Sequence, residues 1–273
     1  MSKETELTKI NYSRNSEEEW NRLYKDPFHR LEFDTTMKFL EKHLPKEGLI
    51  LDAGGGPGRY SIELAKQGYD VTLLDLVLEN LELAREKIKE AGVEENIKEV
   101  TEGSITDLSG FAENSFDAVL CLGAPLSHVH PEKERRKAIA ELVRVAKKDA
   151  PIFISVMGKL GVLSICLNWP DEIKETDHFK RFCLTGDDYK WRGDGYAHFF
   201  EVKELVGLFE DTVEFIENVG LEGLSSPSEE KVNEIAEKEP EVWKNWLEMH
   251  YELCTHPTVV DSSMHFMVIA RKK

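Results

Sequence analysis

The sequence predicts an α/β protein built on one doubly wound, mostly parallel sheet of seven strands. Two observations predict this fold: short apolar runs recur along the chain, and amphipathic helical stretches separate most of them. Strands that alternate with helices pair in parallel, because each helix carries the chain back along the sheet and covers one of its faces. At 273 residues the chain is long for one domain and short for two, so we expect a single domain.

The first predicted helix covers Ser16–Leu44, where apolar residues recur at approximately helical spacing. Asp26-Pro27 interrupts this helix, and Pro45 ends it. The first strand follows at Leu49–Ala53, an apolar run between two glycines that is typical of a strand buried on both faces.

Helices and strands then alternate, with glycines closing the first two helices. In chain order they are a helix at Tyr60–Gln67, a strand at Asp70–Asp75, a helix at Asn80–Ala91, strands at Ile97–Thr101 and Phe116–Leu122, a helix at Glu132–Lys147 and a strand at Pro151–Met157.

The alternation breaks at Gly158–Tyr196, which is rich in Trp, Asp and Gly and has mixed helical and loop character. We interpret this segment as an insertion that caps a pocket. The pattern then resumes with a helix at Val202–Phe209, a strand at Thr212–Val219, two helices between Ser228 and Tyr251, and a strand at Met264–Arg271.

Composition narrows the partners and the location. The chain has 35 Lys and Arg against 52 Asp and Glu, a formal charge of -17, which disfavours nucleic acid as a partner. Its apolar runs are too short to span a membrane and its N-terminus does not resemble a secretory signal, so we expect a cytoplasmic protein. The four cysteines have no paired spacing, which argues against a metal site or a disulfide framework. Nothing in the sequence indicates the oligomeric state.

A glycine-rich segment, Asp52-Ala53-Gly54-Gly55-Gly56-Pro57-Gly58, follows the first strand and opens a helix. Such a loop places backbone N–H groups and a helix N-terminus at the carboxyl edge of the sheet, where ligands bind. Its spacing fits neither the dinucleotide pattern Gly-x-Gly-x-x-Gly nor a P-loop. Asp75, at the end of the second strand, supplies a carboxylate that can accept hydrogen bonds from two ribose hydroxyls.

With these features the sequence resembles the class I S-adenosylmethionine-dependent methyltransferases, which have a Rossmann-like fold. Its segments Leu49–Tyr60, Val71–Leu76, Glu102–Leu108 and Ser115–Gly123 match the family's successive motifs over most of the first 157 residues. A finer match, to a bacterial and archaeal small-molecule branch, rests on Glu19–Leu23 and Gly195–Phe199.

The resemblance implies S-adenosylmethionine as the cofactor and assigns its contacts. Asp52 and the loop of Gly54, Gly55, Gly56, Pro57 and Gly58 would hold the methionine end, Asp75 the ribose and Leu76 the adenine. Ser104 stands where family members often carry an acid, so the adenine contact would rely on Ser104 and the backbone of Ile105. The backbone of Cys121, Leu122 and Gly123 would pass beneath the sulfonium. Aromatic faces attract cations, so we add Tyr12 as a further ligand contact.

The chemistry would be in-line attack by an O, N or S atom of a small molecule on the activated methyl group, which yields S-adenosylhomocysteine. If the acceptor must lose a proton, His is the readiest base, and we name His128 first and His198 second; for each, a structural role is the competing interpretation. The motifs of the branches that methylate nucleic acids, Asn/Asp-Pro-Pro-Tyr/Phe and Pro-Cys, do not occur.

Three alternatives stay open at this point. They are a noncatalytic or regulatory S-adenosylmethionine-binding protein, a thiolate-assisted enzyme using Cys121, Cys166 and Cys183, and a nucleotide-linked oxidoreductase. For the preferred interpretation we divide the single domain 1–273 into an N-terminal helical lid (1–46), a cofactor-binding core (47–157), an inserted cap (158–200) and the C-terminal part of the sheet (201–273). The cap's many aromatic residues would line an acceptor pocket or form the cap's own core.

Overall fold

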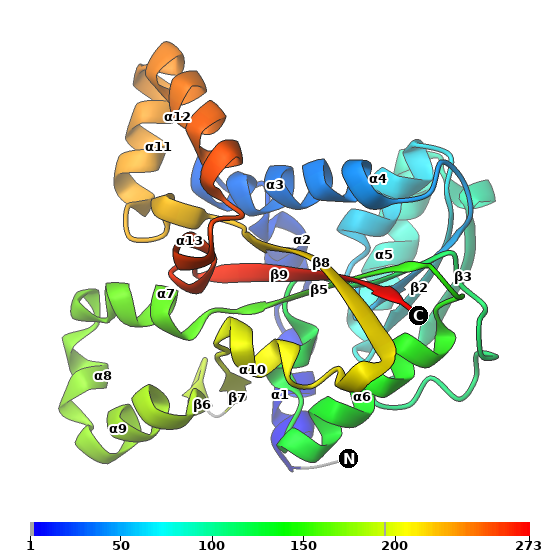
Figure 1. The fold of residues 1–273 in the computed structure, drawn as a ribbon, viewed down its shortest axis with the longest axis horizontal. Coiled ribbons are helices and arrows are strands. Elements are labelled where there is room, and N and C mark those ends of the chain that lie inside the picture. Colours follow the sequence, from blue (N-terminus) through cyan, green and yellow to red (C-terminus); the bar gives the residue numbers. More distant parts are fainter. Residues whose placement is uncertain (1–2, 194) are drawn as a thin grey trace.

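The computed structural model describes residues 3–193 and 195–273, and its centre is a seven-stranded sheet in the order β3-β2-β1-β4-β5-β9-β8 (Figure 1). Strands β1 to β5 are parallel, whereas β9 is antiparallel to both of its neighbours. The strands are β1 (Leu49–Ala53), β2 (Asp70–Asp75), β3 (Ile97–Glu102), β4 (Ala118–Cys121), β5 (Pro151–Met157), β8 (Val213–Gly220) and β9 (His265–Lys272). The predicted fold class is confirmed.

Helices cover both faces of this sheet, because successive residues of its inner strands point to opposite sides. On β4, for example, Val119 packs in one core with α6 (Glu132–Val145) and α10 (Val202–Val206). Its neighbour Leu120 packs in the other core with α3 (Pro27–His43) and α4 (Arg59–Lys66). The edge strand β3 and its neighbour β2 are covered by α5 (Leu78–Ala91).

The N-terminal segment differs from the predicted single helix. It forms α1 (Lys3–Ser13), α2 (Ser16–Arg22) and α3, and the last begins at Pro27. The Asp26 carboxylate caps α3 by accepting a hydrogen bond from the backbone N–H of His29 at 3.0 Å. The break predicted at Asp26-Pro27 is therefore a helix start, and α1 lies further toward the N-terminus than the helix that we expected.

The insertion after β5 is more regular than its sequence suggested. It contains α7 (Lys159–Ile165), α8 (Pro170–Lys174), α9 (Thr176–Thr185) and a two-stranded hairpin of β6 (Asp187–Trp191) and β7 (Gly195–His198). Figure 1 shows these elements projecting from the sheet.

The remaining helices are α11 (Glu229–Lys238), α12 (Pro240–Leu253) and α13 (Pro257–Asp261), between β8 and β9. Helices α11 and α12 pack against each other as a second projection from the body (Figure 1). Within the described residues, every helix is too short or too polar to cross a membrane.

Candidate active site

A cavity of about 630 Å³ lies at the carboxyl ends of β1, β2, β3 and β4. Its floor is the glycine loop, and residues of α1 and α2 line it from the N-terminal side. Of the fourteen residues that we predicted to bind the cofactor, eleven line this cavity: Tyr12, Gly54, Gly55, Gly56, Pro57, Asp75, Leu76, Ser104, Ile105, Leu122 and Gly123. The other three, Asp52, Gly58 and Cys121, lie outside the set of residues that line it.

The glycine loop needs glycine for two reasons. Gly54 has φ of +80°, and a Cβ built there would stand 2.6 Å from the Pro125 side chain. Gly56 has φ of +56° and its built Cβ meets nothing nearer than 3.9 Å, so that side of the loop is open. Glycine permits the positive φ and keeps the backbone accessible from the cavity. Gly58, also at positive φ, instead caps the start of α4.

Asp52 supports this loop from beneath. Its carboxylate is fully buried and accepts a hydrogen bond from the Ser61 hydroxyl at 2.6 Å, and a Cβ at Gly55 would collide with it. Burial raises the pKa of Asp52 to about 6, and the negative charge of Asp75 acts in the same direction. Asp52 thus lies behind the loop and does not line the cavity, whereas we expected it to contact a ligand directly.

Asp75 stands in the cavity wall as predicted. One carboxylate oxygen accepts from the backbone N–H of Gly56 at 2.8 Å, and the other accepts from that of Val77 at 2.9 Å and from the Asn80 amide at 3.3 Å. Each oxygen of an ionised carboxylate can accept about two hydrogen bonds, so these contacts fix the group and leave capacity for a ligand. Burial raises the pKa of Asp75, and the three hydrogen bonds act in the opposite direction.

The opposite wall contains the loops after β3 and β4. Asp107, three residues beyond Ser104, lines the cavity, although our sequence analysis gave it no role. Cys121 is completely buried, and burial raises the pKa of its thiol to about 12. A thiol with that pKa is protonated near neutral pH, which argues against the thiolate alternative.

His128 reaches the cavity, but both of its ring nitrogens are engaged. Nδ1 lies 2.9 Å from the backbone oxygen of Tyr196, which can only accept, so Nδ1 carries the proton. Nε2 is therefore the acceptor for the Tyr12 hydroxyl, 2.9 Å away. Burial lowers the pKa of His128 to about 4, and His128 is consequently neutral near pH 7.

His198 does not line the cavity, contrary to its proposed role on the acceptor. Its side chain is 2% exposed, with Nδ1 2.8 Å from Asp187 and Nε2 2.6 Å from Glu204. Burial acts to lower the pKa of His198, but these two carboxylates raise it, and both ring nitrogens are occupied in a structural polar network.

The aromatic residues of the insertion also lie outside the cavity wall. Phe182 and Phe199 are buried in one cluster, with Phe179 and Trp191 packed against it. Of the two interpretations of these residues, the structure favours the cap's own core.

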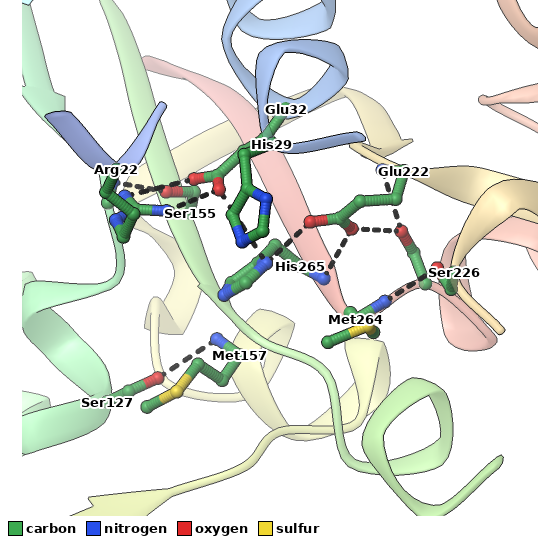
Figure 2. A network of polar contacts seen from close by, with 12 residues as sticks. Arg22, His29, Glu32, Ser127, Ser155, Met157, Glu222, Ser226, Met264 and His265 are labelled. Carbon is green, nitrogen blue, oxygen red and sulfur yellow. Dashed lines mark hydrogen bonds and ion pairs between the residues drawn. The ribbon is translucent and has the colours of Figure 1, made fainter. Parts of the chain in front are cut away.

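A group of polar residues that the sequence analysis missed lies on the α2 side of the cavity. Arg22 lines the cavity, and its guanidinium donates to Glu19 at 2.9 Å and to Glu32 at 2.6 Å. Figure 2 shows the same network continuing to His265 and Glu222, which bond at 2.6 Å. The only sequence signal was the Glu19–Leu23 segment, which contains Arg22 and contributed to the resemblance.

Comparisons with known proteins agree on one family. A family model described as a methyltransferase domain matches residues 50–149. The chain is 30% identical over 167 residues to a glycine/sarcosine N-methyltransferase of Aphanothece halophytica, covering 60% of this chain and 58% of the relative. It is 31% identical over 170 residues to a ubiquinone biosynthesis O-methyltransferase of Rickettsia canadensis, covering 59% of this chain and 66% of that protein. It thus spans less than two thirds of the length of these two relatives.

Among solved structures, one described as a SAM-dependent methyltransferase from Methanosarcina mazei has a TM-score of 0.56 and 25% identity, and the match covers 86% of this chain and 96% of that one. The family match falls on β1 to α6, the part that contains the glycine loop and Asp75, and the structural likeness extends over most of the chain. Residues 50–149 thus form a methyltransferase domain, and the fold over most of the chain is that of an S-adenosylmethionine-dependent methyltransferase.

Proposed function

We propose that this enzyme transfers the methyl group of S-adenosylmethionine to an O, N or S atom of a small molecule. The observation that carries this proposal is a cavity partly covered by the N-terminal helix: α1 supplies Thr8, Lys9 and Tyr12 to its lining. A cavity of about 630 Å³ with this cover fits a small molecule better than a polymer. The charge of -17 also disfavours a polyanionic acceptor.

The residues present fit the cofactor. One oxygen of Asp75 accepts only from the Gly56 N–H and can take a further hydrogen bond from a ribose hydroxyl, and the open side of Gly56 admits a ligand against the backbone. Ser104, Ile105 and Asp107 line the part of the wall where an adenine would lie in this family. We assign Leu76 to the adenine as well.

The methionine end carries one carboxylate and one ammonium group, and two charged side chains of α2 face it in our assignment. Arg22 would pair with the carboxylate and Glu19 with the ammonium, because both line the cavity beside the glycine loop. The Glu19 side chain comes within 3.9 Å of a Cβ built at Gly56. Their mutual bond at 2.9 Å holds both charges in place.

The bound cofactor supplies a methyl group already activated by its sulfonium. The protein then needs to exclude water and to align the acceptor with the methyl carbon. Leu122 and Gly123 line the cavity next to Arg22, and the Gly123 N–H is fixed by donation to the Ser155 hydroxyl at 2.9 Å. In this assignment His128 orients Tyr12 over the cofactor and does not itself act as the base, because its Nε2 already accepts from that hydroxyl.

A binding measurement tests the cofactor site. Titration calorimetry should give micromolar affinity for S-adenosylmethionine and S-adenosylhomocysteine, about -8 kcal/mol. Asp75→Ala should weaken both at least 100-fold, because the ribose hydroxyls lose a charged acceptor. Asp70→Ala is the matched control, since Asp70 starts the same strand at its far end and forms a half-exposed pair with Lys98. Equal affinities in all three proteins would refute the assignment of Asp75.

A turnover measurement separates an enzyme that methylates small molecules from a noncatalytic binder. The protein and S-adenosylmethionine are incubated with a panel of primary and secondary amines, amino acids, phenols and thiols, and release of S-adenosylhomocysteine is followed. Release that depends on one chemical class identifies the acceptor atom. Tight cofactor binding without release from any class would contradict the proposed function.

A further inference from the structure

His265 occupies a position at the carboxyl edge of the sheet, although the family match ends well before it. It is the first residue of β9 and pairs with Met157, the last residue of β5. Strand β4, which leads into Gly123, is the next strand beyond β5. Neighbouring strands are about 4.8 Å apart, so His265 stands about 10 Å from the end of β4. Strand β5 lies between the two, and His265 itself is not among the residues that line the cofactor cavity.

The His265 ring has one fixed nitrogen and one without a partner. Nδ1 donates to the Glu222 carboxylate at 2.6 Å. Among the described residues, Nε2 makes no hydrogen bond that the structure shows, and the side chain keeps 23% of its exposure. In the neutral form of the ring, Nε2 carries a lone pair that an incoming molecule can meet.

Glu222 is itself rigidly held. Its second oxygen accepts from the Ser263 hydroxyl at 3.0 Å and from the backbone N–H of His265 at 2.8 Å. The carboxylate is 3% exposed, so its charge acts on the imidazole with little screening. A buried carboxylate on Nδ1 both orients a histidine and stabilises its protonated form.

A chain of contacts connects this pair to the cofactor cavity (Figure 2). Glu32 lies 3.9 Å from the His265 ring and accepts a hydrogen bond from Arg22, which lines the cavity. His265 is thus separated from the cofactor site by one arginine side chain. The charged groups that face the imidazole are Glu222, Glu32 and Arg22.

A metal site formed by the same residues fits the structure less well. Glu32, Glu222 and His265 place ligand atoms within 4.8 Å of one another. However, each carboxylate oxygen of the two glutamates already faces a donor on Arg22, Ser263 or His265. The arrangement is complete as an ion-pair network, with Nε2 as its one open position among the described residues.

We infer that His265, oriented by Glu222, takes the proton from the acceptor during methyl transfer. The acceptor lone pair forms the new bond to the methyl carbon, and the electrons of the broken carbon–sulfur bond remain on sulfur. The acceptor proton passes to Nε2, and the resulting imidazolium is stabilised by Glu222. This inference rests on the proposed function and assigns to it an O–H, N–H or S–H acceptor.

Accessibility of Nε2 can be tested without any acceptor. Diethyl pyrocarbonate acylates unprotonated imidazole nitrogens that it can reach, and peptide mass spectrometry at pH 8 locates the products. We expect modification of His265 and of the exposed control His256, but not of His198, whose two nitrogens are bonded. Resistance of His265 equal to that of His198 would overturn the inference.

The proton-transfer role is tested by His265→Asn, whose amide can still donate to Glu222 from the Nδ1 position but has no Nε2. With the acceptor found in the panel, kcat should fall about 10²- to 10⁴-fold while the Kd of S-adenosylmethionine changes less than threefold. The matched control is His43→Asn, which alters another histidine–glutamate pair, to Glu217 at 2.8 Å on the outer part of α3. It should leave kcat unchanged.

The pH profile separates proton transfer from a structural role. Both glutamates raise the pKa of His265, so the acid limb of kcat should lie above pH 6.5. Glu222→Gln removes one negative charge and should move this limb to lower pH. An unchanged limb in Glu222→Gln, or wild-type kcat in His265→Asn, would refute the inference and leave the proposed function intact. No turnover by the unaltered protein would overturn both.

Discussion

The carboxyl edge of the sheet contains two histidines, His128 and His265, in contrasting surroundings. His128 follows β4, has both nitrogens bonded to neutral groups and has a pKa lowered to about 4 by burial. His265 begins β9, contacts carboxylates, and has its pKa raised by Glu222 and Glu32. The same side chain is thus kept neutral in one place and favoured as a cation in the other. The difference shows that position in a cavity wall does not by itself make a histidine a base, because the base also needs a free nitrogen and a stabilised protonated form.

The largest expected effect comes from removing one carboxylate of the charged network around His265. Glu32→Ala should lower the free energy of unfolding by about 3 kcal/mol, because the desolvated Arg22 guanidinium loses one of its two carboxylate partners. Glu132→Ala, which removes an exposed pair with Arg136, should cost less than about 1 kcal/mol. Urea denaturation of the three proteins measures both values. A similar loss in the two variants would mean that the network is solvated like a surface pair.

The second effect is a pH dependence of opposite sign at the two histidines. A histidine whose pKa is raised in the folded protein stabilises the fold at pH values below its unfolded pKa of about 6.5. This contribution disappears as the pH rises through the folded pKa. A histidine whose pKa is lowered, such as His128, stabilises the fold at pH values above about 6.5. This contribution is lost as the pH falls toward the folded pKa of about 4. The destabilisation by His265→Asn should therefore be larger at pH 6 than at pH 8.5, whereas that by His128→Asn should be larger at pH 8.5.

Unfolding free energies of both variants and of the unaltered protein, measured between pH 5 and 9, test this prediction. Groups remote from the two sites titrate alike in the three proteins, so the differences report each histidine together with its direct partners, which include Glu222 for His265. A tenfold change in an acid dissociation constant corresponds to about 1.4 kcal/mol. Parallel difference curves would contradict the contrast between the two sites.

The smallest effect concerns the neutral pair of Tyr12 and His128. Tyr12→Phe removes the hydroxyl that donates to Nε2 of His128, and should cost about 1 kcal/mol in unfolding free energy and less than tenfold in cofactor affinity. Tyr24→Phe is the control, because that side chain is 39% exposed. A loss of affinity above 100-fold in Tyr12→Phe would show that this hydroxyl contacts the cofactor directly. His128 would then orient a hydroxyl that binds the cofactor.

Local sequence signals explain why many residues of the cavity wall could be predicted. The glycine loop, Asp75 and Leu76 lie within one strand–helix–strand unit, where chain order fixes spatial order. The alternation of strands and helices likewise predicted the sheet, including the late strands near Thr212 and Met264. Asp52 and Cys121 show the limit of such signals: both lie in the right segments, but both residues are fully buried and neither lines the cavity.

Residue order alone was enough to predict the fold class and the family resemblance, because these depend on periodicity and on contacts between near neighbours in the chain. Which histidine has a free nitrogen emerged only from the folded chain. Arg22, Glu32, Glu222 and His265 come from the two ends of the chain and meet because β9 inserts between β5 and β8 while α3 packs across that face of the sheet. Burial and partner charges set the protonation of each group, and both are properties of the packed chain that residue spacing does not encode.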